Sequence, residues 1–91
     1  MQSVTDRVRE FIVGNLGWEG AADELTEDLP LIQVGVLDSL GILTLVEFLE
    51  ANYEITVYDS EIIPTNLGRL ASIERYVESK ISLRPSSARG N

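Results

Sequence analysis

Apolar residues recur at helical spacing in three separate stretches of this 91-residue chain, and this pattern constrains the fold more than any other feature. The three sets are Val4, Val8, Phe11 and Ile12; Ile42, Leu45, Val46, Leu49 and Tyr53; and Leu70, Ile73, Val77 and Ile81. Residues spaced by three and four lie on one face of an α-helix, which can then pack on a core. The pattern predicts helices at about residues 4–15, 39–52 and 69–82.

The connection over residues 19–38 is too long to lack local order in a compact domain. Pro30 and Gly35 exclude one continuous helix through it. Its own apolar residues predict a loop pinned to the core, with one short helical turn near 22–25. The apolar residues expected to anchor the loop are Leu25, Leu29, Leu31, Ile32, Val34, Val36 and Leu37. Before it, Trp18 lies among turn-forming residues; we expect it to anchor the loop at the core edge, with ligand stacking as the less favoured alternative.

Residues 55–58 alternate as a short strand would, but the chain offers no second strand to pair with, so we expect an extended linker. A short third helix is predicted at 59–63, ended by Pro64. The expected fold is therefore all-α: a four-helix bundle with a long loop between the first and second helices. One domain would cover residues 1–83, and the polar tail at 84–91 is expected to be disordered.

Two residue types are missing. The chain has no cysteine, which excludes disulfides, a thiolate nucleophile and zinc–thiolate sites. It has no histidine, so the most common general base and metal ligand is also missing. Catalysis by Asp, Glu, Lys or Tyr stays open, but these absences argue against an enzyme.

The charges are distributed unevenly. The net charge is −8, and no Lys or Arg occurs between Arg9 and Arg69. Such an acidic block repels nucleic acid and anionic membranes and favours cationic protein surfaces, although a merely solubilising surface is the simpler alternative. No apolar run reaches the roughly 20 residues that span a bilayer, and Gln2–Arg9 is polar. We expect neither membrane insertion nor secretion, and therefore a cytoplasmic location.

The segment Gly35-Val36-Leu37-Asp38-Ser39-Leu40 joins the long loop to the second predicted helix. Asp38 is a suitable helix N-cap, and Ser39 at the first turn could be simply tolerated there. The free N–H groups and the dipole at a helix start also favour an anion, such as a phosphodiester on Ser39 Oγ. Asp38 would oppose that anion unless it turns to cap the helix. No base lies near Ser39 in sequence, so a partner would have to supply the chemistry.

These residues resemble the acyl carrier and peptidyl carrier protein family, which carries a phosphopantetheine serine in Asp-Ser-Leu or Asp-Ser-Met at the start of its second helix. Asp28-Leu29-Pro30-Leu31 resembles the loop before that motif, and Gly35 stands four residues before the serine, as in many discrete carriers. The residues after the motif match too: Leu45, Val46 and Leu49 in the second helix, and Asn66-Leu67 with Leu70–Val77 near the end. The resemblance covers about residues 4–82.

The resemblance implies a four-helix carrier protein without catalytic residues, in which a 4'-phosphopantetheine arm from coenzyme A is attached to Ser39, with Asp38 and Leu40 beside it. The arm would supply the thiol that the chain lacks. The implied partners are a phosphopantetheinyl transferase, an acyl- or aminoacyl-loading ligase or transferase, and downstream biosynthetic enzymes. The carrier itself is expected to be a monomer. The residues implied in partner binding are Leu40, Leu43, Glu47, Glu50 and Glu54.

The details favour a discrete carrier of specialised biosynthesis, such as polyketide or nonribosomal peptide assembly, because Gly-Val-Leu-Asp-Ser differs from the Gly-Ala-Asp-Ser of fatty-acid carriers. Thr44 and Phe48 also dilute the acidic face expected on the second helix. Gly41 could leave room for the arm or a partner, or be surface variation. A fatty-acid-synthesis type carrier is the alternative, and an unmodified interaction module is the alternative of another class. Any cargo pocket would be modest and near Ile42, Val46, Ile63 and Leu67.

Overall fold

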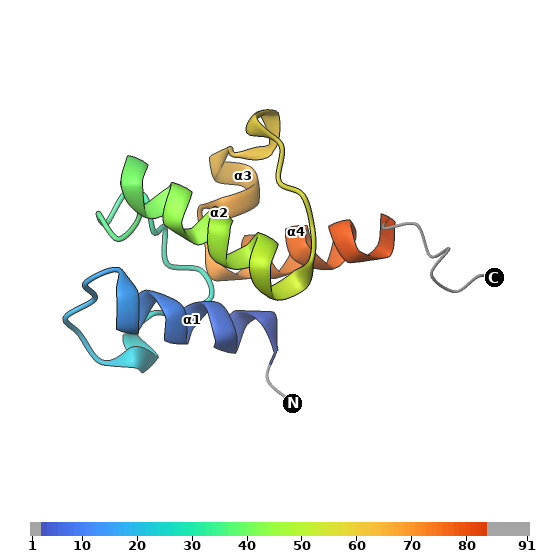
Figure 1. The fold of residues 1–91 in the computed structure, drawn as a ribbon. Helices are drawn as coiled ribbons and strands as arrows, with labels where there is room; N and C mark the ends of the chain where they lie inside the picture. Colours follow the sequence, from blue (N-terminus) through green and yellow to red (C-terminus); the bar gives the residue numbers. More distant parts are fainter. Residues whose placement is uncertain (1–2, 84–91) are drawn as a thin grey trace.

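The computed structural model describes residues 3–83, and all of its regular elements are helical. The α-helices are α1 (Val4–Asn15), α2 (Ser39–Tyr53), α3 (Pro64–Leu67) and α4 (Leu70–Leu83), with 3-10 turns η1 (Ala22–Glu24) and η2 (Asp59–Glu61). Figure 1 shows α1 below α2, α4 passing behind α2, and α3 above α4. The all-α fold predicted from the sequence is confirmed. The predicted disordered tail lies outside the described residues.

Helix α1 begins at a side-chain cap and is fixed to α4. The Ser3 hydroxyl accepts a hydrogen bond from the Asp6 amide at 3.1 Å, as an N-cap serine does. Thr5 donates its amide (3.0 Å) and its hydroxyl to one carboxylate oxygen of Glu74 on α4. A carboxylate at a helix N-terminus satisfies a free N–H and interacts favourably with the helix dipole. The start of α1 is therefore held by a residue 69 positions away.

The long connection between α1 and α2 is ordered and pinned to the core, as predicted. Its side chains Leu25, Leu31 and Leu37 are buried. Its backbone also bonds to the α3–α4 junction: the Leu31 amide donates to the Gly68 carbonyl at 2.8 Å, and the Ala71 amide donates to the Glu27 carbonyl at 3.1 Å. The predicted turn near 22–25 is η1. Trp18 is half-buried against the core and donates its indole N–H to the Ala21 carbonyl, which confirms the loop anchor.

The position predicted for the third helix is wrong. Residues 59–61 form only η2, and α3 begins at Pro64 instead of ending there. Proline lacks an N–H, and its fixed φ suits the first position of a helix, where that N–H would be unsatisfied anyway. The segment at 55–58 is extended and forms no strand, in line with the linker expected there.

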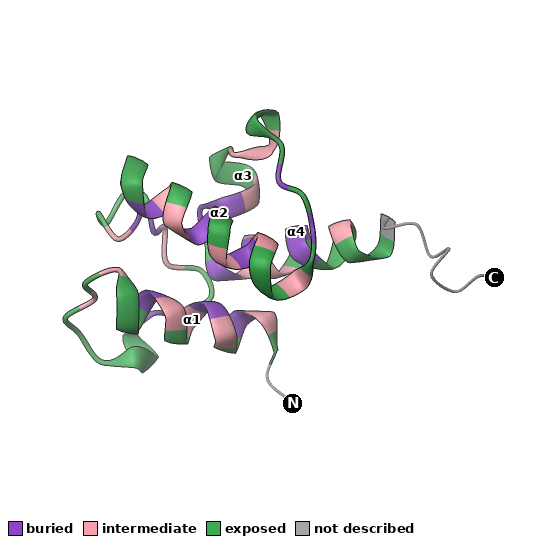
Figure 2. Ribbon diagram, viewed as in Figure 1, coloured by how far each residue is buried: buried purple, intermediate pink, exposed green. Residues whose placement is uncertain are grey.

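The core lies where the helices meet, and Figure 2 shows their buried faces turned inward. Residues Leu45 and Leu49 of α2 and Leu70, Ile73 and Val77 of α4 are all fully buried. Phe48 stacks on Phe11 of α1, with 4.3 Å between ring centroids. Phe48 therefore belongs to the α1–α2 contact and does not dilute an acidic surface, which corrects the reading made from the sequence. Within residues 3–83 no helix is long and apolar enough to cross a membrane.

We expect Leu49→Ala to lower the free energy of unfolding by about 2–5 kcal/mol, because it opens a cavity in a fully buried site. Leu43→Ala on the same helix is the control. Since Leu43 is 54% exposed, its truncation should cost no more than about 0.5 kcal/mol. Urea denaturation followed by circular dichroism measures both, and equal losses would contradict this assignment of the core face of α2.

Candidate functional site

Ser39 is the first residue of α2 and is exposed. Asp38 precedes it in extended backbone conformation, and its Oδ1 accepts a hydrogen bond from the Gly41 amide at 2.7 Å. The carboxylate of Asp38 is thus turned toward the helix start as an N-cap, as its sequence position predicted. The opposition between this charge and an anion on Ser39 is reduced, because the carboxylate is directed to a backbone N–H.

Gly41 supplies the amide to which the Asp38 cap binds. It is buried, and a Cβ at this position would lie 3.2 Å from Asp38 Oδ1, closer than most such contacts. The same Cβ would meet the Val36 carbonyl oxygen at 3.6 Å, an ordinary contact. The glycine therefore serves close packing within the first turn of α2. Its burial against the capping carboxylate argues against surface variation, and room for the arm or a partner, the other alternative considered from the sequence, stays a prediction.

The loop before Ser39 is fixed by a tight backbone turn. The amides of Val36 and Leu37 both donate to the Leu31 carbonyl, at 2.8 and 3.0 Å. Gly35 has φ +86°, a conformation that residues with a side chain rarely adopt, which explains the glycine four residues before Ser39. Leu37 is 1% exposed, so its side chain ties the turn to the core. The Ser39 hydroxyl is therefore exposed, while the loop that precedes it is held in place by hydrogen bonds and by buried Leu37.

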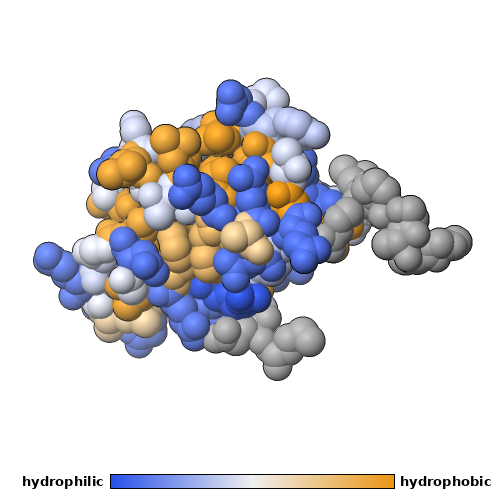
Figure 3. All heavy atoms as spheres, in the orientation of Figure 1, coloured by the Kyte–Doolittle hydropathy of each residue, from blue (hydrophilic) through white to orange (hydrophobic). Residues whose placement is uncertain are grey.

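An apolar surface with acidic neighbours extends from Ser39 along α2. Leu40 is 73% exposed, the highest fraction among the large exposed apolar side chains, and Leu43 and Glu47 are also exposed. Figure 3 shows apolar side chains gathered over α2 and toward α3. Both leucines leave more than half of their surface exposed to solvent, and large contiguous apolar surface is a feature of interaction sites.

The other two predicted partner residues differ from this group. Glu50 is half-buried, and its Oε2 accepts a hydrogen bond from the Val57 amide at 2.9 Å, so it holds the segment that follows α2. Glu54 is exposed and ends α2 in a left-handed conformation, with φ 55°. Sequence reasoning missed the structural contact of Glu50 because Val57 lies outside the helix, where helical spacing says nothing.

A shallow cavity beside the first turn of α2 was also missed by sequence reasoning. It is lined by Asn15 and Leu16 at the end of α1, by Gly35 and Val36 of the loop, and by Asp38, Leu40, Gly41 and Thr44. Of the pocket residues expected near α3, Val46 and Leu67 are packed in the core and Ile63 is 44% exposed. Among residues 3–83 no group of His, Cys, Asp or Glu could hold a metal ion.

No family model matches the chain. Two curated proteins are similar to it over most of its length. One is aminoacyl carrier protein 1 of Bradyrhizobium diazoefficiens, 31% identical over 85 residues, which are 93% of this chain and 91% of that protein. The other is an acyl carrier protein of Akkermansia muciniphila, 36% identical over 76 residues, covering 84% of this chain and 90% of that protein. The chain therefore belongs to the acyl and aminoacyl carrier protein family. Membership indicates a non-catalytic carrier and implies a phosphopantetheine group and partner enzymes.

The effect of Gly41→Ala on the stability of the protein should change sign when the Asp38 cap is removed. Gly41→Ala should destabilise the protein although alanine favours a helix by about 0.5–1 kcal/mol, because its Cβ crowds Asp38 Oδ1. Asp38→Ala removes that atom and should cost about 1 kcal/mol as a lost cap. In the Asp38→Ala protein, Gly41→Ala should then be stabilising.

Thermal and urea unfolding of the two single variants and the double variant measure this coupling. Gly14→Ala in α1 is the matched control, since a Cβ there meets nothing within 4 Å and should stabilise the helix. A Gly41→Ala effect of the same sign with and without Asp38 would contradict the crowding argument.

Proposed function

We propose that this protein carries an acyl or aminoacyl cargo as a thioester on a 4'-phosphopantetheine arm attached to Ser39 Oγ. The observation that carries the proposal is the display of Ser39: an exposed hydroxyl, first in a capped helix, on a loop fixed by Leu31 and Leu37. Membership in the carrier family supports it. The arm, when attached, supplies the thiol that a chain without cysteine cannot provide.

The residues at the start of α2 fit a phosphodiester. Ser39 occupies the first helical position, where unsatisfied backbone N–H groups and the helix dipole stabilise a nearby anion. Asp38 is turned to the Gly41 amide and leaves the Ser39 hydroxyl accessible. In the attachment step, Ser39 Oγ would form a bond to the phosphorus of coenzyme A that bears the pantetheine. The bond from that phosphorus to the bridging oxygen of the pyrophosphate would break, adenosine 3',5'-bisphosphate would leave with that oxygen, and the serine proton would go to a base of the transferase.

The surface around Leu40, Leu43 and Glu47 is the part of α2 that a transferase or loading enzyme would contact. Its two exposed leucines suit an apolar contact, and the acidic side chain suits a cationic enzyme surface. A discrete carrier of specialised biosynthesis is our preferred subtype, and the similarity to an aminoacyl carrier protein is in line with it. A carrier of the fatty-acid-synthesis type is the second candidate, favoured by the similarity to an acyl carrier protein.

Incubation with coenzyme A and a broad-specificity phosphopantetheinyl transferase should add the mass of one phosphopantetheine to the protein. Intact-protein mass spectrometry measures this gain. Ser39→Ala should show none, whereas Ser60→Ala, which removes another exposed hydroxyl, should be modified as the parent is. A folded parent protein that gains no mass would overturn the proposal and favour an unmodified interaction module.

Glu47→Lys should lower kcat/KM for this modification by about threefold to tenfold, mainly through slower association, because it reverses a charge on the proposed contact surface. The loss should shrink as salt is raised, since added ions screen exposed charges. Glu78→Lys changes an exposed residue of α4 by the same charge and should leave kcat/KM nearly unchanged. Equal losses in both variants would point to net charge alone and would contradict a docking surface on α2.

A further inference from the structure

The segment between α2 and α3 lies on the same side of α2 as the attachment serine. Helical spacing places Ser39, Leu43, Val46 and Glu50 along one face, since they are separated by four, three and four residues. At the end of this row, Glu50 accepts the hydrogen bond from the Val57 amide. The row that begins at Ser39 therefore leads to residues 54–63, which join α2 to α3.

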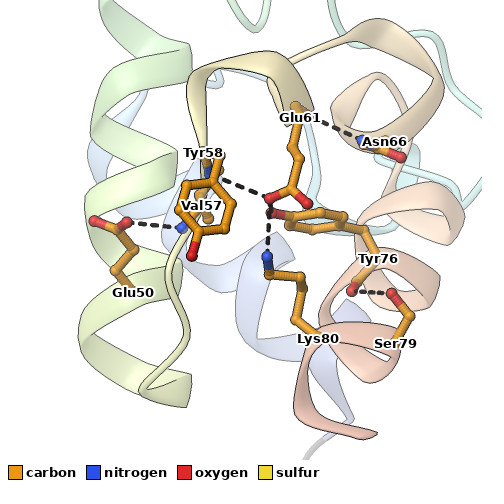
Figure 4. Close-up of polar contacts among 8 residues, drawn as sticks. All are labelled: Glu50, Val57, Tyr58, Glu61, Asn66, Tyr76, Ser79 and Lys80. Carbon is orange, nitrogen blue, oxygen red and sulfur yellow. Dashed lines mark hydrogen bonds and ion pairs between the residues drawn. The ribbon is translucent and has the colours of Figure 1, made fainter. Parts of the chain in front are cut away.

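Helix α4 holds the same segment from the opposite side through Glu61, as Figure 4 shows. One oxygen of Glu61, Oε1, accepts hydrogen bonds from Tyr76 Oη and Lys80 Nζ of α4, each at 2.9 Å, and from the Tyr58 amide at 3.1 Å. The backbone carbonyl of Glu61 also accepts from the Asn66 side chain at 2.9 Å. We call Glu61, Tyr76 and Lys80 the Glu61 latch.

The Glu61 latch is shielded from water more than a typical surface ion pair. The side chains of Lys80 and Glu61 are only 16% and 31% exposed. The ammonium of Lys80 lies 4.7 Å from the ring centroid of Tyr58, within cation–π range. The hydrogen bond from Lys80 lowers the pKa of Glu61, so its carboxylate is charged at neutral pH and protonates only at lower pH than a free glutamate. Such charge-assisted bonds are stronger than neutral ones.

Apolar side chains of the core pack beneath the segment. Ile55 and Val57 are each 8% exposed and belong to the core. Behind them Leu45, Leu49 and Leu67 are 0–1% exposed. A chain leaving Ser39 on this side could enter the helix bundle only by displacing residues 54–63, and Glu50 and the Glu61 latch oppose that displacement from two helices.

We propose that the Glu61 latch keeps the cargo end of the arm outside the helix bundle, which suits this carrier to short or polar cargo over long alkyl chains. The proposal rests on the proposed function of Ser39. It assigns Glu61, Tyr76 and Lys80 a positioning role: they do not touch the cargo but close the segment that would have to open for it.

The first test measures the latch in the unmodified protein. Lys80→Met should speed amide hydrogen exchange over residues 55–63 by about tenfold, since it removes a shielded charge-assisted bond. Asp6→Asn is the control, because it removes an ion pair far from the segment, Asp6–Arg9 on α1. Exchange over 55–63 that is equal in the two variants would overturn the proposal. Tyr76→Phe, which removes one hydrogen bond, provides the same comparison if Lys80→Met does not fold.

The second test measures the cargo. The transferase is supplied with acetyl- or decanoyl-coenzyme A, and hydroxylamine cleavage of each protein thioester is compared with that of the same thioester on coenzyme A. The quantity compared is the cleavage rate on the protein divided by the rate on coenzyme A. In the parent protein this ratio should agree within about twofold between the acetyl and decanoyl thioesters. In Lys80→Met the ratio for the decanoyl thioester should fall about fivefold. A decanoyl thioester already protected in the parent, or still unprotected in Lys80→Met, would overturn the proposal. A parent that accepts no arm contradicts the proposed function instead, and the exchange experiment still decides the latch.

Discussion

The fold depends on the apolar face of α4. Leu70, Ile73 and Val77 are fully buried, and α4 contacts α1, α2 and α3. Apolar burial supplies about 25 cal/mol per Å², and a chain of 91 residues has only one core from which to draw it. Polar contacts extend the role of α4: Glu74 holds the start of α1, and Tyr76 and Lys80 hold the segment before α3. Loss of α4 packing would therefore loosen α1, α2 and α3.

The site depends on this core through the long loop. Leu31 connects the two, because its side chain is buried, its amide bonds to the α3–α4 junction, and its carbonyl accepts the amides of Val36 and Leu37. From there Leu37 and the Asp38 cap set the position of Ser39. A carrier needs a serine that is accessible to several enzymes and yet fixed in position. An exposed residue at a helix start, supported by a loop whose leucines are buried in the core, meets both requirements.

Helical spacing was sufficient to predict α1, α2 and α4, because their apolar residues lie on one face of each helix. It failed at α3 because a proline such as Pro64 can mark either end of a helix. Proline disrupts a helix when it lies in the interior, but it is favoured at the first helical position. The Asp38 cap was predictable because it is a local contact within three residues. The Phe11–Phe48 stack and the Glu61 latch were not, because they join residues distant in sequence and helical spacing says nothing about which helix faces which.

The acidic residues illustrate the same limit and bear on partner recognition. From the sequence they form one block that favours cationic surfaces. In the structure Glu50 and Glu61 of this block accept hydrogen bonds from other parts of the fold and help to hold it together. Their carboxylates are engaged in these bonds, so a partner that binds them has to compete with the bonds. In the proposed function, recognition by a cationic enzyme would then depend on outward acids such as Glu47, together with the apolar contact at Leu40 and Leu43. The proposed contact surface is therefore smaller than the acidic block, and the apolar share of it is correspondingly larger.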